Sequence, residues 1–167
     1  MNAHIEIEQL IDDHGQELYR YLWRMFGDDN EAQNCLQDTY IRTMGALARL
    51  NGNANYRAWL YRIATNASLT HLKRRSRSHQ RENSLHPFLS AKDPTPLQVV
   101  TEQELLQRVA LAIEQLPQMQ RAALTLRKYQ ELSYTKIGTA LDCSPEAARA
   151  NVYQALRKLR TELKDEE

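Results

Sequence analysis

The chain has 167 residues, which is enough for one domain or for two small ones. Its two distant cysteines and five histidines show no ligand spacing, which argues against a disulfide framework and against a metal site, and we expect the protein to need no cofactor. The net charge of +1 is strongly segregated along the chain: residues 1–50 carry −5, 51–81 carry +7 without any acid, 82–117 carry −3, 118–160 carry +5 and 161–167 carry −3.

Three helices are expected in the first 75 residues, because apolar residues recur at three- and four-residue steps over about 5–26, 31–50 and 56–75. Turn-forming residues separate them at 27–30 and 51–55. The inward positions expected for the three helices are, in order, Leu10, Ile11, Leu18, Leu22 and Met25; Cys35, Leu36, Tyr40, Met44 and Leu47; and Leu60, Ile63, Ala64, Ala67 and Leu72.

The periodicity fails over 76–98, a polar segment with three prolines that we expect to be a flexible linker. Four further helices are expected over about 99–116, 117–129, 133–141 and 145–163. In the first of these the inward residues should be Leu105, Leu106, Val109 and Ile113. The sequence thus predicts an all-α fold of two small helical domains, 1–75 and 99–167, and the C-terminal one should be a helix-turn-helix domain.

The last two helices carry the most informative pattern. Ser133 and Ser144 are good N-caps, and Pro145 occupies a first helical position, where its missing N–H costs nothing. One side of the final helix is an apolar stripe made of Ala148, Val152, Ala155, Leu156, Leu159 and Leu163. The opposite side is short and polar at its start and basic toward its end, which suits a helix that enters a DNA major groove, although a solvated helical hairpin has the same pattern.

Several segments together resemble the bacterial sigma-70 family, in particular its short extracytoplasmic-function group. Residues 32–42 (AQNCLQDTYIR) are similar to the helix that docks on the polymerase clamp, and residues 56–66 with 71–75 to the promoter −10 segment. Residues 116–121, 132–141 and 155–160 are similar to the −35 domain.

The resemblance implies a non-enzymatic, cytoplasmic transcription initiation factor. It would bind core RNA polymerase at the clamp of the largest subunit, direct it to promoters, and contact promoter DNA both as duplex and as melted strands. An anti-sigma factor would be its inhibitory partner. The N-terminus lacks the pattern of a signal peptide, and no apolar run is long enough to insert directly into a membrane.

Site residues follow from the same match. The expected polymerase-binding residues are Asn34, Gln37, Asp38, Ile41 and Arg42. Amides, aromatic rings and cations for the −10 element are expected at Asn53, Asn55, Tyr56, Arg57, Trp59, Arg62, Asn66, Lys73, Arg74 and Arg75, and Trp59 fits either a stacking surface or the core. The −35 contacts are expected at Ser133, Tyr134, Arg149, Ala150, Tyr153, Gln154, Arg157 and Lys158.

Two other functions remain open on the sequence alone. A helix-turn-helix transcriptional regulator that is not a sigma subunit accounts for 99–163 but leaves 1–75 without a purpose, and such regulators usually dimerise. A purely structural or adaptor protein would require both cationic segments to be incidental.

Overall fold

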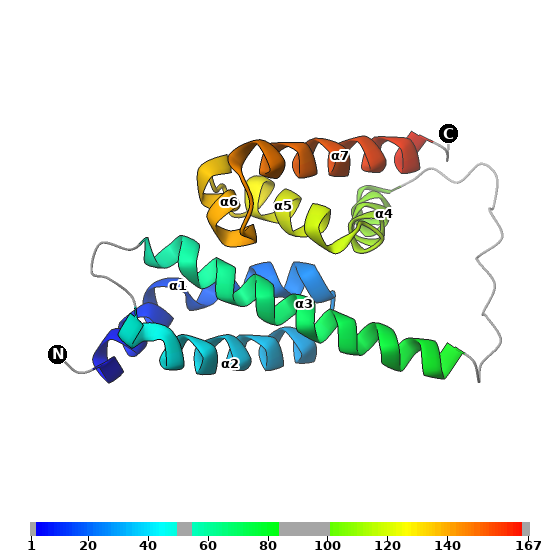
Figure 1. The fold of residues 1–167 in the computed structure, drawn as a ribbon. Helices are drawn as coiled ribbons and strands as arrows, with labels where there is room; N and C mark the ends of the chain where they lie inside the picture. The colour runs from blue at the N-terminus through cyan, green and yellow to red at the C-terminus, as the bar shows by residue number, and fades with distance from the viewer. Residues whose placement is uncertain (1–2, 50–54, 84–100, 165–167) are drawn as a thin grey trace.

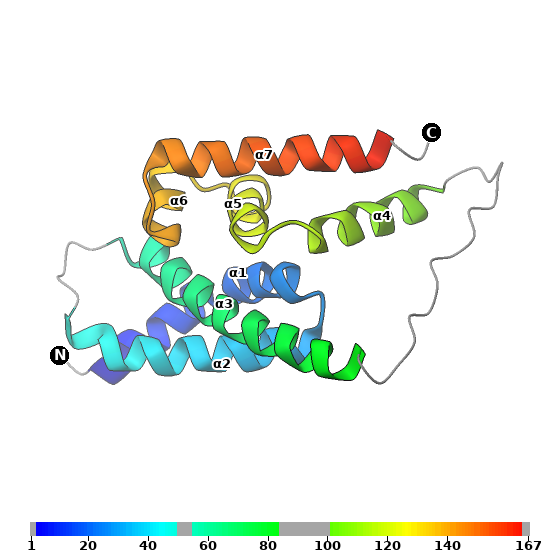
Figure 2. The same ribbon diagram turned by 45° about the vertical axis from the view of Figure 1, so that its right-hand side comes forward.

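The computed structural model describes residues 3–49, 55–83 and 101–164, and within these ranges it contains helices and no strand. The N-terminal lobe consists of α1 (Ala3–Phe26), α2 (Asp29–Ala46), the short 3-10 helix η1 (Leu47–Arg49) and α3 (Tyr56–Asn83). The C-terminal lobe consists of α4 (Glu102–Glu114), α5 (Gln118–Lys128), α6 (Tyr134–Leu141) and α7 (Pro145–Lys164). Figures 1 and 2 show the two lobes stacked on one another. The predicted all-α fold of two helical units is confirmed.

Side-chain caps begin several of these helices. The Asp28 carboxylate accepts a hydrogen bond from the Glu31 amide at the start of α2. At the start of α4, Thr101 and Glu104 form a reciprocal capping box, in which each side chain accepts a hydrogen bond from the other residue's amide. Such caps satisfy amides that have no partner inside the helix.

The predicted helix-turn-helix is present in α6 and α7. The Ser133 hydroxyl accepts a hydrogen bond from the Lys136 amide, and the Ser144 hydroxyl accepts one from the Ala147 amide, so both expected caps are confirmed. Between the helices Asp142 adopts a left-handed conformation with φ of 56°. The turn is so tight that a Cβ on Gly138 would lie 2.6 Å from the Cys143 carbonyl oxygen, so this position requires glycine.

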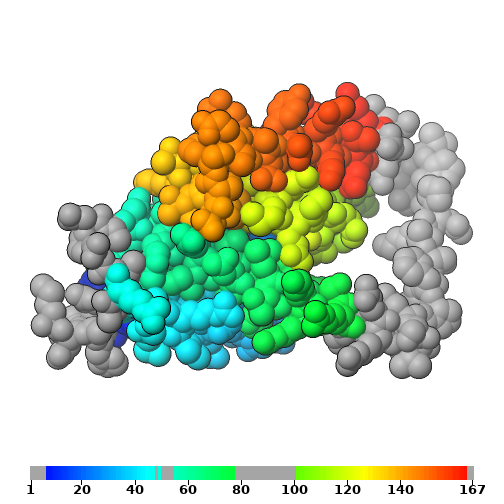
Figure 3. Space-filling model, in the orientation of Figure 1, coloured from blue at the N-terminus to red at the C-terminus, as the bar shows by residue number. Residues whose placement is uncertain are grey.

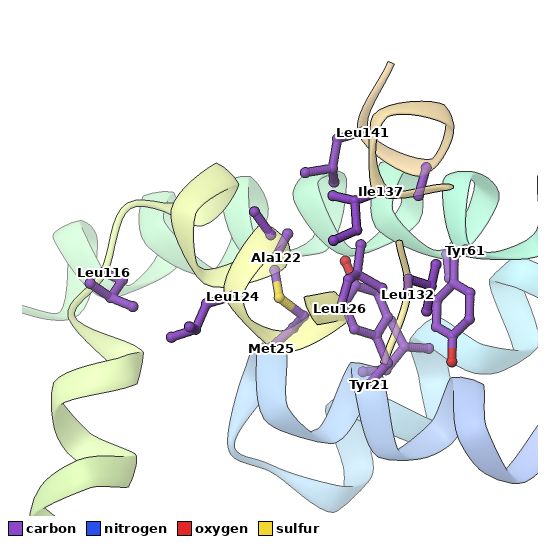
Figure 4. Packing of buried hydrophobic residues seen from close by; sticks show 14 of the residues in the cluster. Tyr21, Met25, Tyr61, Leu116, Ala122, Leu124, Leu126, Leu132, Ile137 and Leu141 are labelled. Atoms are coloured by element: carbon purple, nitrogen blue, oxygen red, sulfur yellow. The ribbon is translucent and has the colours of Figure 1, made fainter. Parts of the chain in front are cut away.

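The two lobes share one buried apolar cluster. Tyr21 and Tyr61 from the N-terminal lobe are fully buried beside Leu132 and Ile137 from the C-terminal lobe (Figure 4). Helix α6 packs on α3 and helix α5 packs on α1. In the space-filling view the lobes meet along α3 and α6 (Figure 3).

Three of the structural expectations were wrong in detail. Helix α3 does not end near residue 75 but continues to Asn83, so part of the expected linker is helical, and 84–98 lies outside the described residues. Met44 was expected in the core but is exposed. Leu105 and Leu106 are exposed as well, because α4 packs on α7 and buries residues near its C-terminal end, Ala112 and Ile113.

Candidate nucleic-acid and protein interfaces

The residues expected to bind polymerase lie on α2. Asn34, Gln37, Ile41 and Arg42 are exposed, and the Ile41 side chain is 62% exposed, which is unusual for a large apolar residue. Asp38 is half-buried between two partners: its carboxylate is 3.1 Å from the Arg42 guanidinium and 3.2 Å from the His71 ring on α3. The surface therefore combines one free apolar side chain with a positioned carboxylate and exposed amides.

The start of α3 gathers the amide and aromatic groups expected for the −10 element. The Asn55 side chain accepts a hydrogen bond from the Ala58 amide, so it acts as a cap, whereas Asn53 lies outside the described residues. Tyr56 is half-buried, and so is Trp59, which packs against the core cluster while part of its ring stays accessible. Trp59 is therefore part of the core packing, while its stacking role stays a prediction.

Three of the expected −10 arginines are already paired with carboxylates inside the molecule. Arg57 Nε donates to Glu17 at 2.8 Å, Arg62 lies 3.4 Å from Asp142 in the turn before α7, and Arg75 donates to Glu31 at 3.0 Å. By contrast, the expected −10 residues Asn66, Lys73 and Arg74 are exposed. The structure thus divides the expected −10 surface into an engaged part and an accessible part.

Glu17 is the centre of a polar network between the lobes. Its carboxylate accepts hydrogen bonds from the Tyr61 hydroxyl at 2.5 Å and from Arg57, and it lies 3.0 Å from His14. Burial alone would raise the pKa of Glu17, but the hydrogen bonds from Tyr61, His14 and Arg57 and the charge of Arg57 together lower it below its ordinary value. Gln130 of the C-terminal lobe completes the network.

The expected −35 residues on α7 form one solvent-facing surface. Arg149, Tyr153 and Arg157 follow one another at four-residue steps, as do Ala150, Gln154 and Lys158, and all six are exposed. The Tyr153 side chain is 66% exposed. Tyr153 thus lies among cationic side chains on the exposed face of α7, whereas Ala148, Val152, Ala155 and Leu159 form the buried face.

The two expected −35 residues at the start of α6 have different surroundings. The Ser133 hydroxyl is used as the helix cap. The Tyr134 ring is half-buried, and the guanidinium carbons of Arg127 and Arg149 lie 4.2 and 5.1 Å from its centroid. Arg149, the expected base-reading residue, is thus in contact with Tyr134.

Several residues that organise these surfaces were not singled out from the sequence. Arg121 is buried and donates to the backbone carbonyls of Met25, Ile113, Glu114 and Leu116, so it joins α1 to the end of α4 and to the loop that follows it. Glu17, Gln130 and Asp142 hold the interface between the lobes. They are polar residues, whereas the sequence signal for buried contacts is apolar periodicity, so no pattern distinguished them.

The described part of the chain also contains potential metal ligands and free cysteine thiols. No group of three or more His, Cys, Asp or Glu side chains there has the arrangement of a metal site. Burial raises the pKa of the Cys35 thiol to about 12, which keeps it protonated at neutral pH. Among the described helices none has the length and apolar character needed to cross a membrane.

Comparison with known proteins assigns both lobes. Residues 10–78 match the family model for sigma-70 region 2, and residues 106–159 match that for sigma-70 region 4. RNA polymerase sigma-H factor of Pseudomonas aeruginosa is 31% identical over 140 residues, which cover 79% of this chain and 72% of that protein. The chain belongs to the sigma-70 family of RNA polymerase sigma factors, in its extracytoplasmic-function group. A sigma factor is a transcription factor that binds core RNA polymerase and directs it to promoters.

Two further relatives of this sigma factor belong to the extracytoplasmic-function group. The extracytoplasmic-function sigma factor SigE of Mycolicibacterium smegmatis is 29% identical over 156 residues, covering 92% of this chain, and the chain spans 60% of the length of that relative. SigW of Bacillus subtilis is 24% identical, with 93% of this chain and 88% of that protein covered.

Solved structures agree on the fold. The sigma factor RpoE of Bartonella quintana, in complex with the anti-sigma factor NepR, superposes with a TM-score of 0.72 at 21% identity, covering 95% of this chain and 97% of that one. CnrH in complex with the cytosolic domain of CnrY gives a TM-score of 0.69 at 23% identity, covering 96% and 89%.

Proposed function

We propose that this sigma factor contacts the clamp of core RNA polymerase through α2, the −10 element through α3 and the −35 element through α7. The observation that carries the proposal is that each helix exposes a different side-chain chemistry. Helix α2 presents Ile41 among polar groups, α3 has no acidic residue before its last turn, and α7 presents a cationic polar face.

At the −10 element the melted strand meets groups suited to single-stranded DNA. Half-buried Tyr56 and Trp59 offer rings on which a base stacks, worth about 1–3 kcal/mol per base. Exposed Asn66 offers an amide that both donates to and accepts from a base edge. Lys73 and Arg74 sit where phosphates of the same strand would pass, because they lie two turns further along α3.

At the −35 element α7 enters the major groove of duplex DNA. Arg149 near its start reads a guanine, whose O6 and N7 atoms match the guanidinium, and Ala150 contacts a thymine methyl group. Tyr153 and Gln154 reach bases or phosphates, while Arg157 and Lys158 contact phosphates that position the helix without specifying sequence.

Both DNA contacts together require the lobes to separate. The −10 and −35 elements are about 25 base pairs apart, or about 85 Å of B-form DNA. A compact chain of this length has a radius of gyration of about 15 Å and is therefore only about 40 Å across. Because α6 packs directly on α3, the closed arrangement cannot reach both elements. We propose that core polymerase binds the opened form, in which Arg62 is released from Asp142.

An inhibitory partner is also part of the proposal. RpoE and CnrH, which share this fold, were each solved with a bound partner, NepR and CnrY respectively. We propose that an anti-sigma factor holds this chain inactive, and that the protein works in the cytoplasm, where polymerase and template are found.

Size-exclusion chromatography with light scattering tests the proposal. The purified chain should elute as a monomer and should comigrate with core RNA polymerase in a one-to-one complex. A dimer that binds a symmetric duplex site and ignores the polymerase would instead identify a conventional helix-turn-helix regulator.

A further inference from the structure

The Tyr134 ring contacts two arginines that come from different helices of the C-terminal lobe. The guanidinium carbon of Arg127, near the end of α5, is 4.2 Å from the ring centroid, and that of Arg149, in the second turn of α7, is 5.1 Å away. Both distances lie within the range of cation–π attraction, which reaches to about 6 Å. The Tyr134 ring on α6 therefore links Arg149 of α7 to Arg127 of α5.

Two members of this group are held in place and the third is not. The Tyr134 ring is half-buried against the core cluster and begins a helix capped by Ser133. Arg127 is half-buried too, and its Nη1 donates a hydrogen bond of 3.1 Å to the Leu132 carbonyl. Arg149 is exposed, and its contact with the ring is the interaction that the structure shows for its guanidinium. The ring thus acts as a rigid support for a side chain that would otherwise rotate freely.

We infer that Tyr134 is a positioning residue that pre-orients Arg149 for reading a base pair of the −35 element through its aromatic ring and not through its hydroxyl. The inference rests on the proposed role of Arg149. An arginine that reads guanine must present its planar fork in one orientation, and fixing a long side chain costs conformational entropy. A ring that holds the guanidinium before DNA arrives reduces the entropy that is lost on binding.

The hydroxyl of Tyr134 suggests a second, different role for this residue. A tyrosine at a helix start would also be suited to donate its hydroxyl to a phosphate. Phenylalanine keeps the ring and lacks the hydroxyl, whereas leucine keeps apolar volume and lacks the ring. The two roles therefore differ in what they predict for Y134F, which should bind like the wild type if the ring is needed and as weakly as Y134L if the hydroxyl is needed.

The test is a double-mutant cycle on the full-length protein in holoenzyme with core polymerase. The probes are a duplex promoter fragment selected by transcription with the wild-type holoenzyme and copies of it with single substitutions in the −35 element. The proteins are the wild type, Y134F, Y134L, R149A and Y134L/R149A, and thermal unfolding establishes that each is folded. Should Y134L fail to fold, Y134M takes its place in the cycle, because methionine is also apolar and lacks a ring.

The expected results are specific. Y134L should weaken binding about two- to fivefold and should reduce discrimination at the same −35 base pair that R149A affects. Y134F should match the wild type, and Y134L should have no further effect in the R149A background. Equal losses in Y134F and Y134L, or additive losses in the double variant, would overturn the inference and leave the role of Arg149 intact. If R149A binds every probe like the wild type, both the role of Arg149 and this inference fail.

Discussion

The side-chain amide of Gln130 donates a hydrogen bond of 2.6 Å to the hydroxyl of Tyr61, and the two residues belong to different lobes. The same amide donates to the backbone carbonyl of Glu17 at 2.9 Å. The backbone carbonyl of Gln130 accepts a hydrogen bond from the Arg57 guanidinium, also at 2.9 Å. Arg24 of α1 also stacks on the ring of Tyr129, with 3.8 Å between guanidinium carbon and centroid. The lobe interface therefore has a polar part whose groups can bond to water when the lobes separate.

We predict that Gln130→Leu weakens closure of the lobes. Leucine fills a similar volume but leaves the part-buried Glu17 carbonyl without this donor, which should lower the free energy of unfolding by about 1–3 kcal/mol. Small-angle scattering should show a radius of gyration above the roughly 15 Å of a compact chain. The matched control is Gln33→Leu on the exposed surface of α2. Unchanged stability and dimensions in Gln130→Leu would show that this hydrogen bond does not hold the lobes together.

We predict that acid weakens the same interface through Glu17. Its pKa in the folded protein lies below the ordinary 4.5, so the folded state binds fewer protons than the unfolded state as that group titrates. The stabilisation from Glu17 is therefore fully present above pH 4.5 and is lost as the pH falls through the lowered value. Denaturant unfolding at a series of pH values should show that Glu17→Gln lacks this dependence. The prediction fails if the two proteins lose stability in parallel.

Arg121 should be indispensable for stability. Its buried guanidinium donates to four backbone carbonyls, and lysine, a single point charge, cannot reproduce that arrangement. Arg121→Lys should lower the free energy of unfolding by at least about 2 kcal/mol, since buried carbonyls lose their donors. Arg149→Lys, at an exposed position, should change it by less than about 0.5 kcal/mol. Equal denaturation midpoints for the two variants would contradict this account of Arg121.

Ile41 should be an anchor for core polymerase. Its exposed side chain is apolar and lies beside the positioned Asp38, as expected of a side chain at the centre of an interface. Ile41→Ala should weaken binding to core polymerase about tenfold or more and leave thermal stability unchanged. Gln16→Ala, exposed on α1, should bind like the wild type. Wild-type affinity in Ile41→Ala would exclude this residue from the interface.

Local structure was largely readable from the sequence, because caps and apolar periodicity are local signals. Ser133, Ser144 and the buried stripe of α7 occur as predicted. The end of α3 was missed for a physical reason: apolar residues stop recurring there, yet residues 76–83 contain no glycine or proline, so nothing interrupts the helix.

The contact between the lobes was not readable from the sequence. Gln130 and Arg57 bond to residues that are distant in the chain, and neither is distinguished from an ordinary surface residue by the sequence around it. Leu105 and Leu106 were predicted to be buried because they are apolar, but they are exposed. The sequence of a helix does not show whether a neighbouring helix covers a given apolar residue. The identities of the expected site residues followed from the family resemblance, while the pairing of Arg62 with Asp142 required the structure.

Run-off transcription with purified core polymerase over a library of genomic fragments tests the central claim most directly. The account predicts discrete transcripts that appear only when this protein is added, from start sites that share one sequence near −10 and another near −35. Transcription no different from that of core polymerase alone would contradict it.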